Sequence, residues 1–438
     1  WTKEDIEGKD YQVKISVVGT VKTRPKDDLY VAALIDGVES STFPTTNKYT
    51  ASVECTRNGK KIDAKESIEW SGTEWELTTK IKSGNVRCNA TFESLAPAPN
   101  GWYEAGNGTL LASLRDNNTL KTPITTPGAA VSTADEALLA SAVDDYGTSY
   151  YFRGAVTNNY VKFANKCWRI VRVSGDGSVK LILHNDNTTK VANPCDAANN
   201  SASAAFARYS GEKYTSAFNE KGEDNAYVGF KFGTPGSSTY EATHANTNKS
   251  TILTNLETWY NNNDNNFKKY EKVIADTVWC NDKTNVTDTT FNPYGYSNVN
   301  GQGYAKNITY YGATQRLIST SNSAGGTGPS LKCNGNLSKI TSKVGLITAD
   351  ELAFAGYAFN LSNTTTYLQE NATDSWWWSL SPNYFYVDAG VWFVFGNNGL
   401  FIFRNVPDVG GVRPSISLIS SVTISGGTGT SEDPYIIN

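Results

Sequence analysis

The sequence predicts a β-rich α+β protein in which a small β-sandwich-like module precedes a larger module of strands and a few helices. Three observations support this prediction. Short runs rich in β-branched and aromatic residues recur along the chain, separated by turns that contain Gly, Asn and Asp. Charged residues make up only 19% of the chain, a composition that suits a β-rich extracellular protein better than a helical cytoplasmic one. A length of 438 residues exceeds what one core ordinarily organises, so several domains are expected.

The first predicted element is a half-buried strand near the N-terminus, because its apolar residues alternate with polar ones. We expect residues 1–24 to form this strand segment and residues 25–94 to form a small sandwich, in which Asp36-Gly37 is a hairpin turn. Such a strand can close its own sheet or add to the sheet of a neighbouring copy, and we favour the second role. The candidate assembly residues are Tyr11, Val13, Ile15 and Val17.

A stretch rich in Pro, Gly, Asn and Thr separates this sandwich from the rest of the chain. Regular periodicity fades over residues 95–140, which we predict to be a linker with a short helix along the Ala- and Leu-rich run 134–143. Residues 141–438 are predicted to form one large α+β module. Within it, apolar residues at helical spacing predict a helix over residues 252–260, and Thr348 begins a second helix.

Several features indicate an extracellular setting. The sequence begins with Trp1, which suggests a processed or truncated form, and it contains no methionine, which fits an oxidising environment. No apolar run approaches the roughly 18 residues that a membrane span requires. The net charge is −4 and no cluster of Lys and Arg stands out, so nucleic-acid binding is not expected.

The six cysteines form an even set, as a disulfide framework requires. Each successive couple lies within one local unit, which favours sequential pairing. Metal ligation or redox chemistry would need a Cys-x-x-Cys motif or nearby histidines, and the sequence has neither. The predicted disulfides are Cys55–Cys88, Cys167–Cys195 and Cys280–Cys333.

The larger module contains several distinctive motifs. They are Cys167-Trp168-Arg169-Ile170-Val171-Arg172, Gly345-Leu346-Ile347-Thr348-Ala349-Asp350-Glu351, Trp378-Ser379-Leu380-Ser381-Pro382, Gly411-Val412-Arg413-Pro414, and Gly427-Thr428-Gly429-Thr430 followed by Pro434-Tyr435. With these motifs, residues 144–438 resemble a family of surface proteins from Firmicute- and Mollicute-type bacteria. Residues 30–93 resemble a small β-module that often accompanies them. The resemblance implies a place on a bacterial cell surface or appendage.

The end of the chain is also similar in outline to C-type-lectin-like domains of the formylglycine-generating-enzyme type. In those domains an arginine near the C-terminus closes the fold, and Arg413 would take that place. The oxidase activity is not carried over, because it needs a paired reactive cysteine arrangement that this sequence does not offer.

Residues that could serve in catalysis have structural explanations. The only histidines, His184 and His244, are interpreted as surface residues in or beside loops. Asp350 and Glu351 could act as a carboxylate pair, but Glu351 completes a capping box with Thr348, and Asp350 suits the positive N-terminal end of the same helix. We therefore predict that the chain is not an enzyme.

No metal site or cofactor is predicted, and Ca²⁺ is the one alternative considered. Three aspartates in Asn-rich loops could ligate it through oxygen atoms, although the spaced acidic loop of a typical calcium site is absent. These aspartates are Asp186, Asp264 and Asp282.

A dense aromatic cluster lies near the C-terminus, where Gly396-Asn397-Asn398-Gly399 predicts a hairpin between residues 391–395 and 400–403. Both faces of the first strand are apolar, so it is either buried on both faces or exposes one face for binding. We favour the core and keep a ligand or subunit interface as the alternative. The candidates are Trp376, Trp377, Tyr384, Tyr386, Trp392, Phe393, Phe395, Phe401, Phe403 and Arg404.

These observations favour an extracellular bacterial surface or appendage subunit, pilus-like or filamentous, that acts by self-assembly, by adhesion or by both. A monomeric lectin-like adhesin with a ligand surface on the larger module is the alternative. A secreted carbohydrate-active enzyme is the third hypothesis. The expected partners are further copies of the chain, or a glycan or protein on a host or neighbouring cell.

Overall fold

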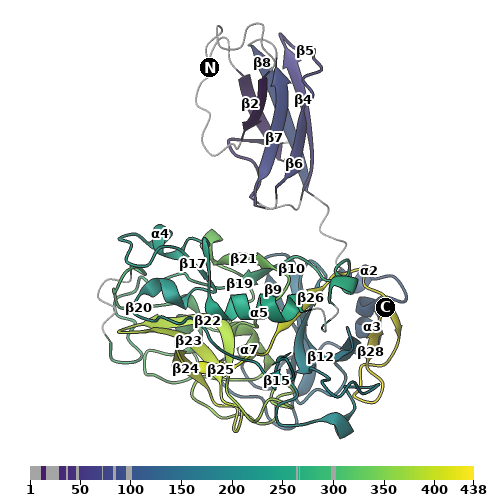
Figure 1. Cartoon of the computed structure of the whole chain (residues 1–438), viewed down its shortest axis with the longest axis vertical. Coiled ribbons are helices and arrows are strands. Elements are labelled where there is room, and N and C mark those ends of the chain that lie inside the picture. The colour runs from purple at the N-terminus through teal and green to yellow at the C-terminus, as the bar shows by residue number, and fades with distance from the viewer. Residues whose placement is uncertain are drawn as a thin grey trace. The chain divides into compact units, whose positions relative to one another are not determined.

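The computed structural model in Figure 1 divides the chain into two compact units, Trp1–Pro99 and Asn100–Asn438. Strands account for 37% of the residues and helices for 14%, which confirms the β-rich α+β prediction. The residues that the structure describes are 11–15, 29–35, 38–45, 49–71, 73–81, 85–94, 101–262, 265, 267–296 and 302–438.

The described strands of the first unit form two sheets. The three-stranded sheet is antiparallel, and its strands in order are β1 (Tyr11–Ile15), β7 (Trp75–Ile81) and β6 (Ser67–Trp70). The five-stranded sheet has the order β3 (Val38–Ser40), β2 (Leu29–Ile35), β8 (Val86–Ser94), β4 (Tyr49–Arg57) and β5 (Lys60–Lys61). All its strands pair antiparallel except β2 and β8, which run parallel.

Alternation along the strands builds the core of this unit. In β8, Val86, Cys88, Ala90 and Phe92 are buried, whereas the residues between them are half-buried, as expected where one sheet face packs inward. Leu77 of β7 joins the same core cluster. The N-terminal strand, expected to form a segment apart, pairs with β7 of its own chain and therefore belongs to this unit.

The second unit contains two large sheets. The eight-stranded sheet consists of β9 (Ala137–Asp144), β10 (Gly147–Gly154), β11 (Tyr160–Phe163), β12 (Lys166–Val173), β13 (Val179–Asn185), β26 (Ser415–Leu418), β27 (Ile424–Gly426) and β28 (Tyr435–Ile437). The six-stranded sheet consists of β16 (Thr215–Ala217), β20 (Thr309–Tyr310), β22 (Trp377–Phe385), β23 (Ala389–Val394), β24 (Phe401–Asn405) and β25 (Val409–Gly411). Figure 1 shows β22 to β25 together in yellow-green, and the antiparallel pairing of β23 with β24 confirms the predicted C-terminal hairpin.

Three short two-stranded ladders complete the strands. They are β14 (Arg208–Tyr209) with β15 (Glu212–Lys213), β17 (Lys231–Phe232) with β18 (Asn248–Lys249), and β19 (Thr277–Cys280) with β21 (Lys339–Ser342). The α-helices among the described residues are α2 (Gly101–Glu104), α3 (Leu110–Asn117), α4 (Tyr240–His244), α5 (Thr251–Asn261), α6 (Gly312–Leu317) and α7 (Ala349–Ala355). Short 3₁₀ turns cover Ala197–Asn199, Asn225–Val228, Phe267–Tyr270 and Asn336–Ser338.

Two predicted helices are confirmed and one is wrong. The helix α5 covers the predicted run, and α7 begins at the predicted capping box, in which the Thr348 hydroxyl accepts from the Glu351 amide at 3.0 Å. The run 134–143 is not helical, because its residues from Ala137 onward form β9, which pairs with β10 over its whole length. Tertiary strand pairing thus overrides the helix preference of Ala and Leu. A helix does lie in the predicted linker, but further upstream, at α3.

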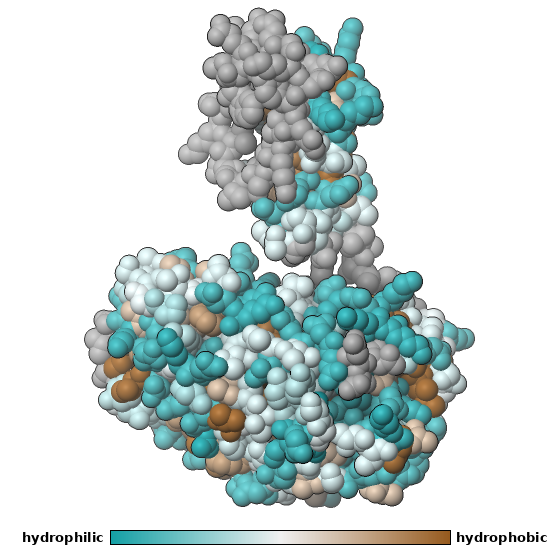
Figure 2. Space-filling view, viewed as in Figure 1, coloured by the Kyte–Doolittle hydropathy of each residue, from teal (hydrophilic) through white to brown (hydrophobic). Residues whose placement is uncertain are grey.

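One hydrophobic core draws on both large sheets of the second unit. Its largest fully buried members are Trp168, Trp259, Trp279, Trp377, Trp378 and Trp392. On the face shown in Figure 2, apolar residues of this unit form scattered spots among polar ones. Among the described residues, no helix is long and apolar enough to span a membrane.

Candidate interaction site

The first strand of the aromatic hairpin, β23, is buried on both faces, whereas its second strand, β24, is half-buried beyond Phe401. Every residue of β22 and β23 is buried, because β23 lies between β22 and β24 with aromatic side chains packed against each face. Trp392 packs against Phe359 on one face, and Phe393 packs against Trp376 on the other. The candidates that are at most 1% exposed are core residues, which agrees with the favoured interpretation and rules out the alternative of a ligand contact for them: Trp377, Trp392, Phe393 and Phe401.

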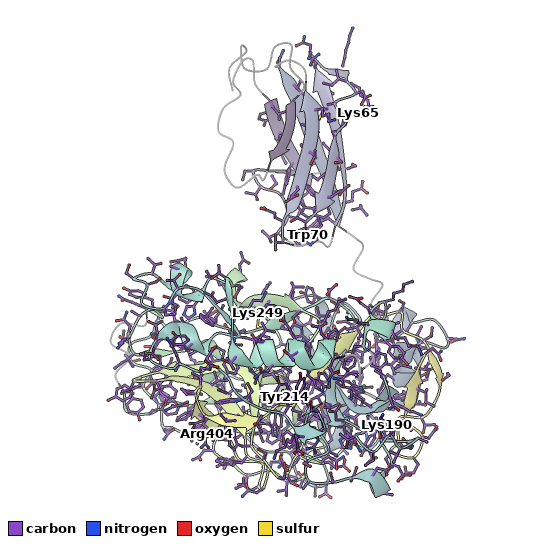
Figure 3. All side chains as sticks on the ribbon, viewed as in Figure 1. Lys65, Trp70, Lys190, Tyr214, Lys249 and Arg404 are labelled. Atoms are coloured by element: carbon purple, nitrogen blue, oxygen red, sulfur yellow. A yellow bond between two sulfur atoms is a disulfide. The ribbon has the colours of Figure 1, made fainter. Side chains whose placement is uncertain are left out.

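On the face that carries Phe393, an arginine side chain covers the edge of this core. The guanidinium of Arg404 (labelled in Figure 3) lies 4.7 Å from the Trp376 ring centre and 5.7 Å from that of Phe393. Arg404 also donates to Asp408 at 2.7 Å. The half-buried Trp376 thus lies beneath a paired cation, so this face presents a charged cover over its aromatic rings. Phe395 is also half-buried and packs against Phe393.

The other face leaves a smaller aromatic surface open to solvent. Tyr386 is 39% exposed and Val387 is 70% exposed in the turn between β22 and β23. The Tyr386 ring stacks on Tyr296, with ring centres 4.0 Å apart and planes 5° from parallel. We call Tyr296, Tyr386 and Val387 the tyrosine patch.

The tyrosine patch rests on a layer of buried aromatic rings. Tyr384 is 9% exposed and packs against Phe403 at 4.8 Å between ring centres, and Tyr294 packs against both. Burial raises the pKa of Tyr384 to about 12, so its hydroxyl stays protonated at neutral pH. Tyr294 and Tyr296 were not among the residues predicted from the sequence, although the aromatic spacing of Tyr294-Gly295-Tyr296 could have indicated them.

Both histidines are fully buried, so their interpretation as surface residues is wrong. His184 is the sixth residue of β13, and its Nε2 lies 3.1 Å from the Asn371 side-chain nitrogen. Burial together with Arg169 and Arg413 lowers the pKa of His184 well below its usual value. His184 is therefore neutral at neutral pH.

His244 ends α4 and lies 2.6 Å from the carbonyl oxygen of Gly303. Burial, assisted by the charge of Lys283, lowers the pKa of this imidazole to about 3. A neutral ring then donates through Nε2 to that carbonyl. Both histidines are enclosed by protein, where they can anchor loops but cannot reach a substrate in solution.

The motif around Glu351 is part of a buried charge network. Its Oε1 accepts from Arg172 Nε at 2.7 Å and from Lys180 Nζ at 2.6 Å, and Arg172 also donates to Asp144 at 2.9 Å. Burial alone would raise the pKa of Glu351, but Lys180 and Arg172 together lower it to about 2. Glu351 is thus a permanent anion in the core as well as a helix cap.

A second network holds the neighbouring aspartate. Arg316 donates two hydrogen bonds to Asp350, at 2.7 and 2.8 Å, and a third to Asp282 at 2.7 Å. The cavity lined by these two networks has a volume of about 20 Å³, room for about one water molecule. It cannot hold a sugar or a peptide, and the carboxylates of Asp350 and Glu351, which line it, are each paired with a cation.

Two of the three calcium candidates are each held by a cation. Asp186 pairs with Lys166, and Asp282 pairs with Arg316, whereas Asp264 lies outside the described residues. Within the described part of the chain, no three His, Cys, Asp or Glu side chains are grouped so that they could hold a metal ion.

Arg413 is buried and ties several segments together. Its Nε donates to the carbonyl oxygen of Leu183 at 3.0 Å, and its Nη1 contacts that of Leu368. The guanidinium lies 4.9 Å from the Trp377 ring centre. Burial lowers the pKa of Arg413 to about 10, which still leaves it charged at neutral pH. Arg413, which lies near the C-terminus, therefore links β13 to the segment around Leu368.

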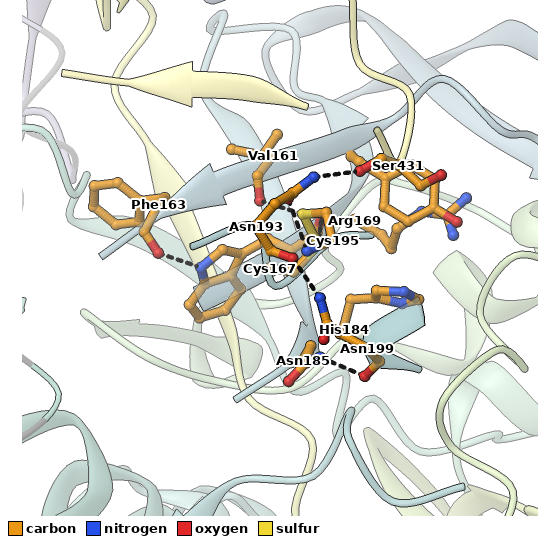
Figure 4. Close-up of a disulfide and its surroundings, with 12 residues drawn as sticks. Val161, Phe163, Cys167, Arg169, His184, Asn185, Asn193, Cys195, Asn199 and Ser431 are labelled. Carbon is orange, nitrogen blue, oxygen red and sulfur yellow. Dashed lines mark hydrogen bonds between the residues drawn. A yellow bond between two sulfur atoms is a disulfide. The ribbon is translucent and has the colours of Figure 1, made fainter. Parts of the chain in front are cut away.

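All three predicted disulfides are confirmed. Cys55–Cys88 joins directly opposed residues of β4 and β8, and Cys280–Cys333 closes a loop of the second unit. The buried pair Cys167–Cys195, shown in Figure 4, fastens a loop to β12. Asn193 holds that loop, because it accepts from the Cys195 amide at 3.1 Å and donates to the Ser431 carbonyl at 2.9 Å.

The assembly candidates Tyr11, Val13 and Ile15 lie in β1, and Val17 lies outside the described residues. In the register of the ladder, Tyr11 is opposite Ile81 and Ile15 is opposite Leu77. β1 is an edge strand, with β7 as its one ladder partner among the described strands. In this structure, β1 pairs with β7 of the same copy. The role that we favoured is pairing with a neighbouring copy.

A second edge in the first unit has an open side. β3 pairs with only the last three residues of β2, so residues 29–32 have no ladder partner on that side among the described strands. A hollow of about 250 Å³ lies along this edge, lined by residues that include Tyr30, Val31 and Phe43. An extended segment could pair there through its backbone.

Comparison of the chain with protein-family models, with curated proteins and with solved structures finds no match.

Proposed function

We propose that this chain is an extracellular bacterial surface or appendage subunit that assembles with copies of itself and does not act as an enzyme. The observation that carries the proposal is that β1 is an edge strand, held to the first unit by one antiparallel ladder among the described strands. An edge strand held by a single ladder is an element that copies of a protein can exchange at low cost.

Strand exchange would reproduce contacts that the chain already makes. If β1 of one copy pairs with β7 of another, every backbone hydrogen bond of the ladder is retained, so the exchange has little enthalpic cost. Residues 16–28 separate β1 from β2 in the sequence, a length that permits pairing in either copy. The open side of β2 is a further edge at which a neighbour could pair.

The remaining features suit this setting. Three disulfides fit an oxidising compartment. The resemblance to surface proteins and to C-type-lectin-like domains also favours an extracellular setting. The larger unit would then be the part displayed on the assembly. We assign no catalytic role, because His184 and His244 are enclosed and the carboxylates Asp350 and Glu351 are held by cations.

A cysteine-pairing experiment tests strand exchange directly. Gln12 lies opposite Lys80 in the β1–β7 ladder, so cysteines at these positions can form a disulfide. We expect a Gln12→Cys chain mixed with a Lys80→Cys chain to yield a disulfide-linked heterodimer under oxidising conditions. A Lys61→Cys chain, whose cysteine lies in the other sheet, is the matched control. Heterodimers no more abundant with Lys80→Cys than with the control would contradict the proposal.

Negative-stain microscopy of the native material adds a second measurement. Filaments or arrays are expected, and they should be lost when residues 1–15 are deleted while the larger unit keeps its thermal transition. If assemblies persist without β1, they do not depend on strand exchange.

The tyrosine patch supports a second candidate function, adhesion to a glycan. The rings of Tyr296 and Tyr386 are stacked and partly exposed, and we expect the apolar face of a sugar to stack on the outer face of the Tyr386 ring. We expect Tyr386→Ala to abolish binding on a glycan array. Tyr209→Ala is the matched control, because Tyr209 is 44% exposed and stacks on Tyr214 elsewhere on this unit. Equal loss in both variants would count against the tyrosine patch.

A further inference from the structure

The charged pair Lys166 and Asp186 is buried beside the Cys167–Cys195 disulfide. The side chain of Lys166 is 8% exposed and that of Asp186 is 3% exposed. The Nζ of Lys166 contacts Asp186 Oδ1 and also donates to the Asp186 carbonyl at 3.1 Å. Cys167 is opposite Asn185 in the β12–β13 ladder, so Lys166 and Asp186 lie just beyond the last paired residues.

The backbone around Asp186 holds its carboxyl group in place. Its Oδ2 accepts from the Arg208 amide at 2.5 Å, and its own amide donates to the Ala204 carbonyl at 2.9 Å. The ring of Trp259 lies 5.6 Å from Lys166 Nζ, so the pair has an aromatic neighbour and little access to water. The amine and the carboxyl carbon are therefore held together in a dry site, the condition that favours their reaction.

A second buried lysine–carboxylate pair shows why this one differs. Glu351 accepts from both Lys180 and Arg172, and these cations lower its pKa to about 2, so it remains a carboxylate. In contrast, burial raises the pKa of Asp186 despite the opposing effect of Lys166, which favours its acid form. A carboxylic acid can be attacked by a neutral amine, whereas a carboxylate strongly resists such attack.

We propose that Lys166 and Asp186 form an intramolecular amide cross-link, a modification site that is independent of the assembly role. The driving force is the removal of two buried charges, because a neutral amide needs far less solvation than a buried ammonium and carboxylate.

The reaction is balanced without any further reagent. A proton passes from Nζ to Oδ1, which converts the ammonium and carboxylate to an amine and an acid. The nitrogen lone pair then attacks Cγ, and the Arg208 amide stabilises the negative charge that develops on Oδ2. A second proton from Nζ moves to Oδ1, the Cγ–Oδ1 bond breaks, and one water molecule leaves.

Mass spectrometry of the full chain tests the cross-link. After reduction of the disulfides, the wild-type chain should weigh less than its sequence by the mass of one water molecule. Trypsin should fail to cleave after Lys166, and a branched peptide should join the segments that contain Lys166 and Asp186.

Two variants serve as controls. Lys166→Arg keeps a cation beside Asp186 but offers a guanidinium, which is a poor nucleophile, and Asp186→Ala removes the carbon that is attacked. Both variants should show the full sequence mass. A full-mass wild-type chain that is cleaved after Lys166 would overturn the proposal and leave an ordinary ion pair. A branched peptide through Lys180 and Glu351 instead would also overturn it, because the argument from the two carboxyl groups would be wrong.

Discussion

The two units of this chain place their charges in opposite environments. In the first unit, the pairs Lys61–Glu54 and Lys65–Asp63 join side chains that are 53–71% exposed. In the second, Arg153 and Glu136 are both completely buried at a distance of 3.0 Å. A small sandwich has too little interior to enclose a charge with all its partners, whereas the larger unit can surround each charge with several donors and acceptors. This difference indicates that the stability of the first unit depends on its alternating apolar residues and one disulfide. The stability of the second unit depends also on buried ion pairs.

Of the changes considered, breaking the buried charge network around Glu351 should have the largest effect on the free energy of unfolding. We expect Glu351→Ala to lower the free energy of unfolding of the second unit by about 3–5 kcal/mol, because Lys180 and Arg172 lose a buried partner and α7 loses its capping box. Urea unfolding followed by tryptophan fluorescence measures this change. Glu54→Ala in the first unit is the matched control and should have no measurable effect. Equal effects would remove the contrast between the two units.

The burial of the aromatic hairpin gives the next prediction. Trp392→Ala should cost about 3–5 kcal/mol of unfolding free energy, because it leaves a large cavity between Phe359 and Phe401. Tyr386→Ala, in the tyrosine patch, should change the free energy of unfolding by less than about 0.5 kcal/mol. Thermal unfolding of the two variants separates core from surface. If Trp392→Ala left stability intact, our assignment of this residue to the core would be wrong.

Lowering the pH should reduce the stability of the second unit gradually rather than in one step. His244 has a folded pKa of about 3, below its value of 6.5 in an unfolded chain, so the unfolded chain takes up its proton first as the pH falls. This group is therefore expected to remove up to about 1.4 kcal/mol of stability per pH unit between about pH 6.5 and 3. Glu351, with a folded pKa of about 2, adds a similar loss below about pH 4.5.

A pH series of urea unfolding curves checks the slope. His244→Gln should reduce the slope above about pH 4.5, and the slope that remains in this range is expected from His184, whose folded pKa burial also lowers well below its usual value. The first unit contains no histidine, so its transition should stay constant over the same upper range. A first unit that weakens in parallel would show that the histidine is not responsible.

The candidate interaction site could be predicted only in part. The aromatic cluster was recognised because its residues are adjacent in sequence, but which rings are covered depends on segments far away, such as Phe359 against Trp392. Tyr296 joins Tyr386 across a long stretch of chain, and no local pattern links them. The histidines were misplaced for the same reason, since a polar neighbourhood in sequence says little about burial.

What the sequence alone determined is local. Sequential cysteine pairing, the capping box at Thr348, the helix α5 and the C-terminal hairpin all depend on residues close together in the chain, and each agrees with the structure. The tertiary structure decided the rest. It converted the Ala- and Leu-rich run into β9, because an eight-residue ladder with β10 outweighs helix propensity, which is worth at most a few tenths of a kcal/mol per residue. It also paired β1 with β7 and enclosed both histidines, since burial and strand partners depend on which distant segments meet.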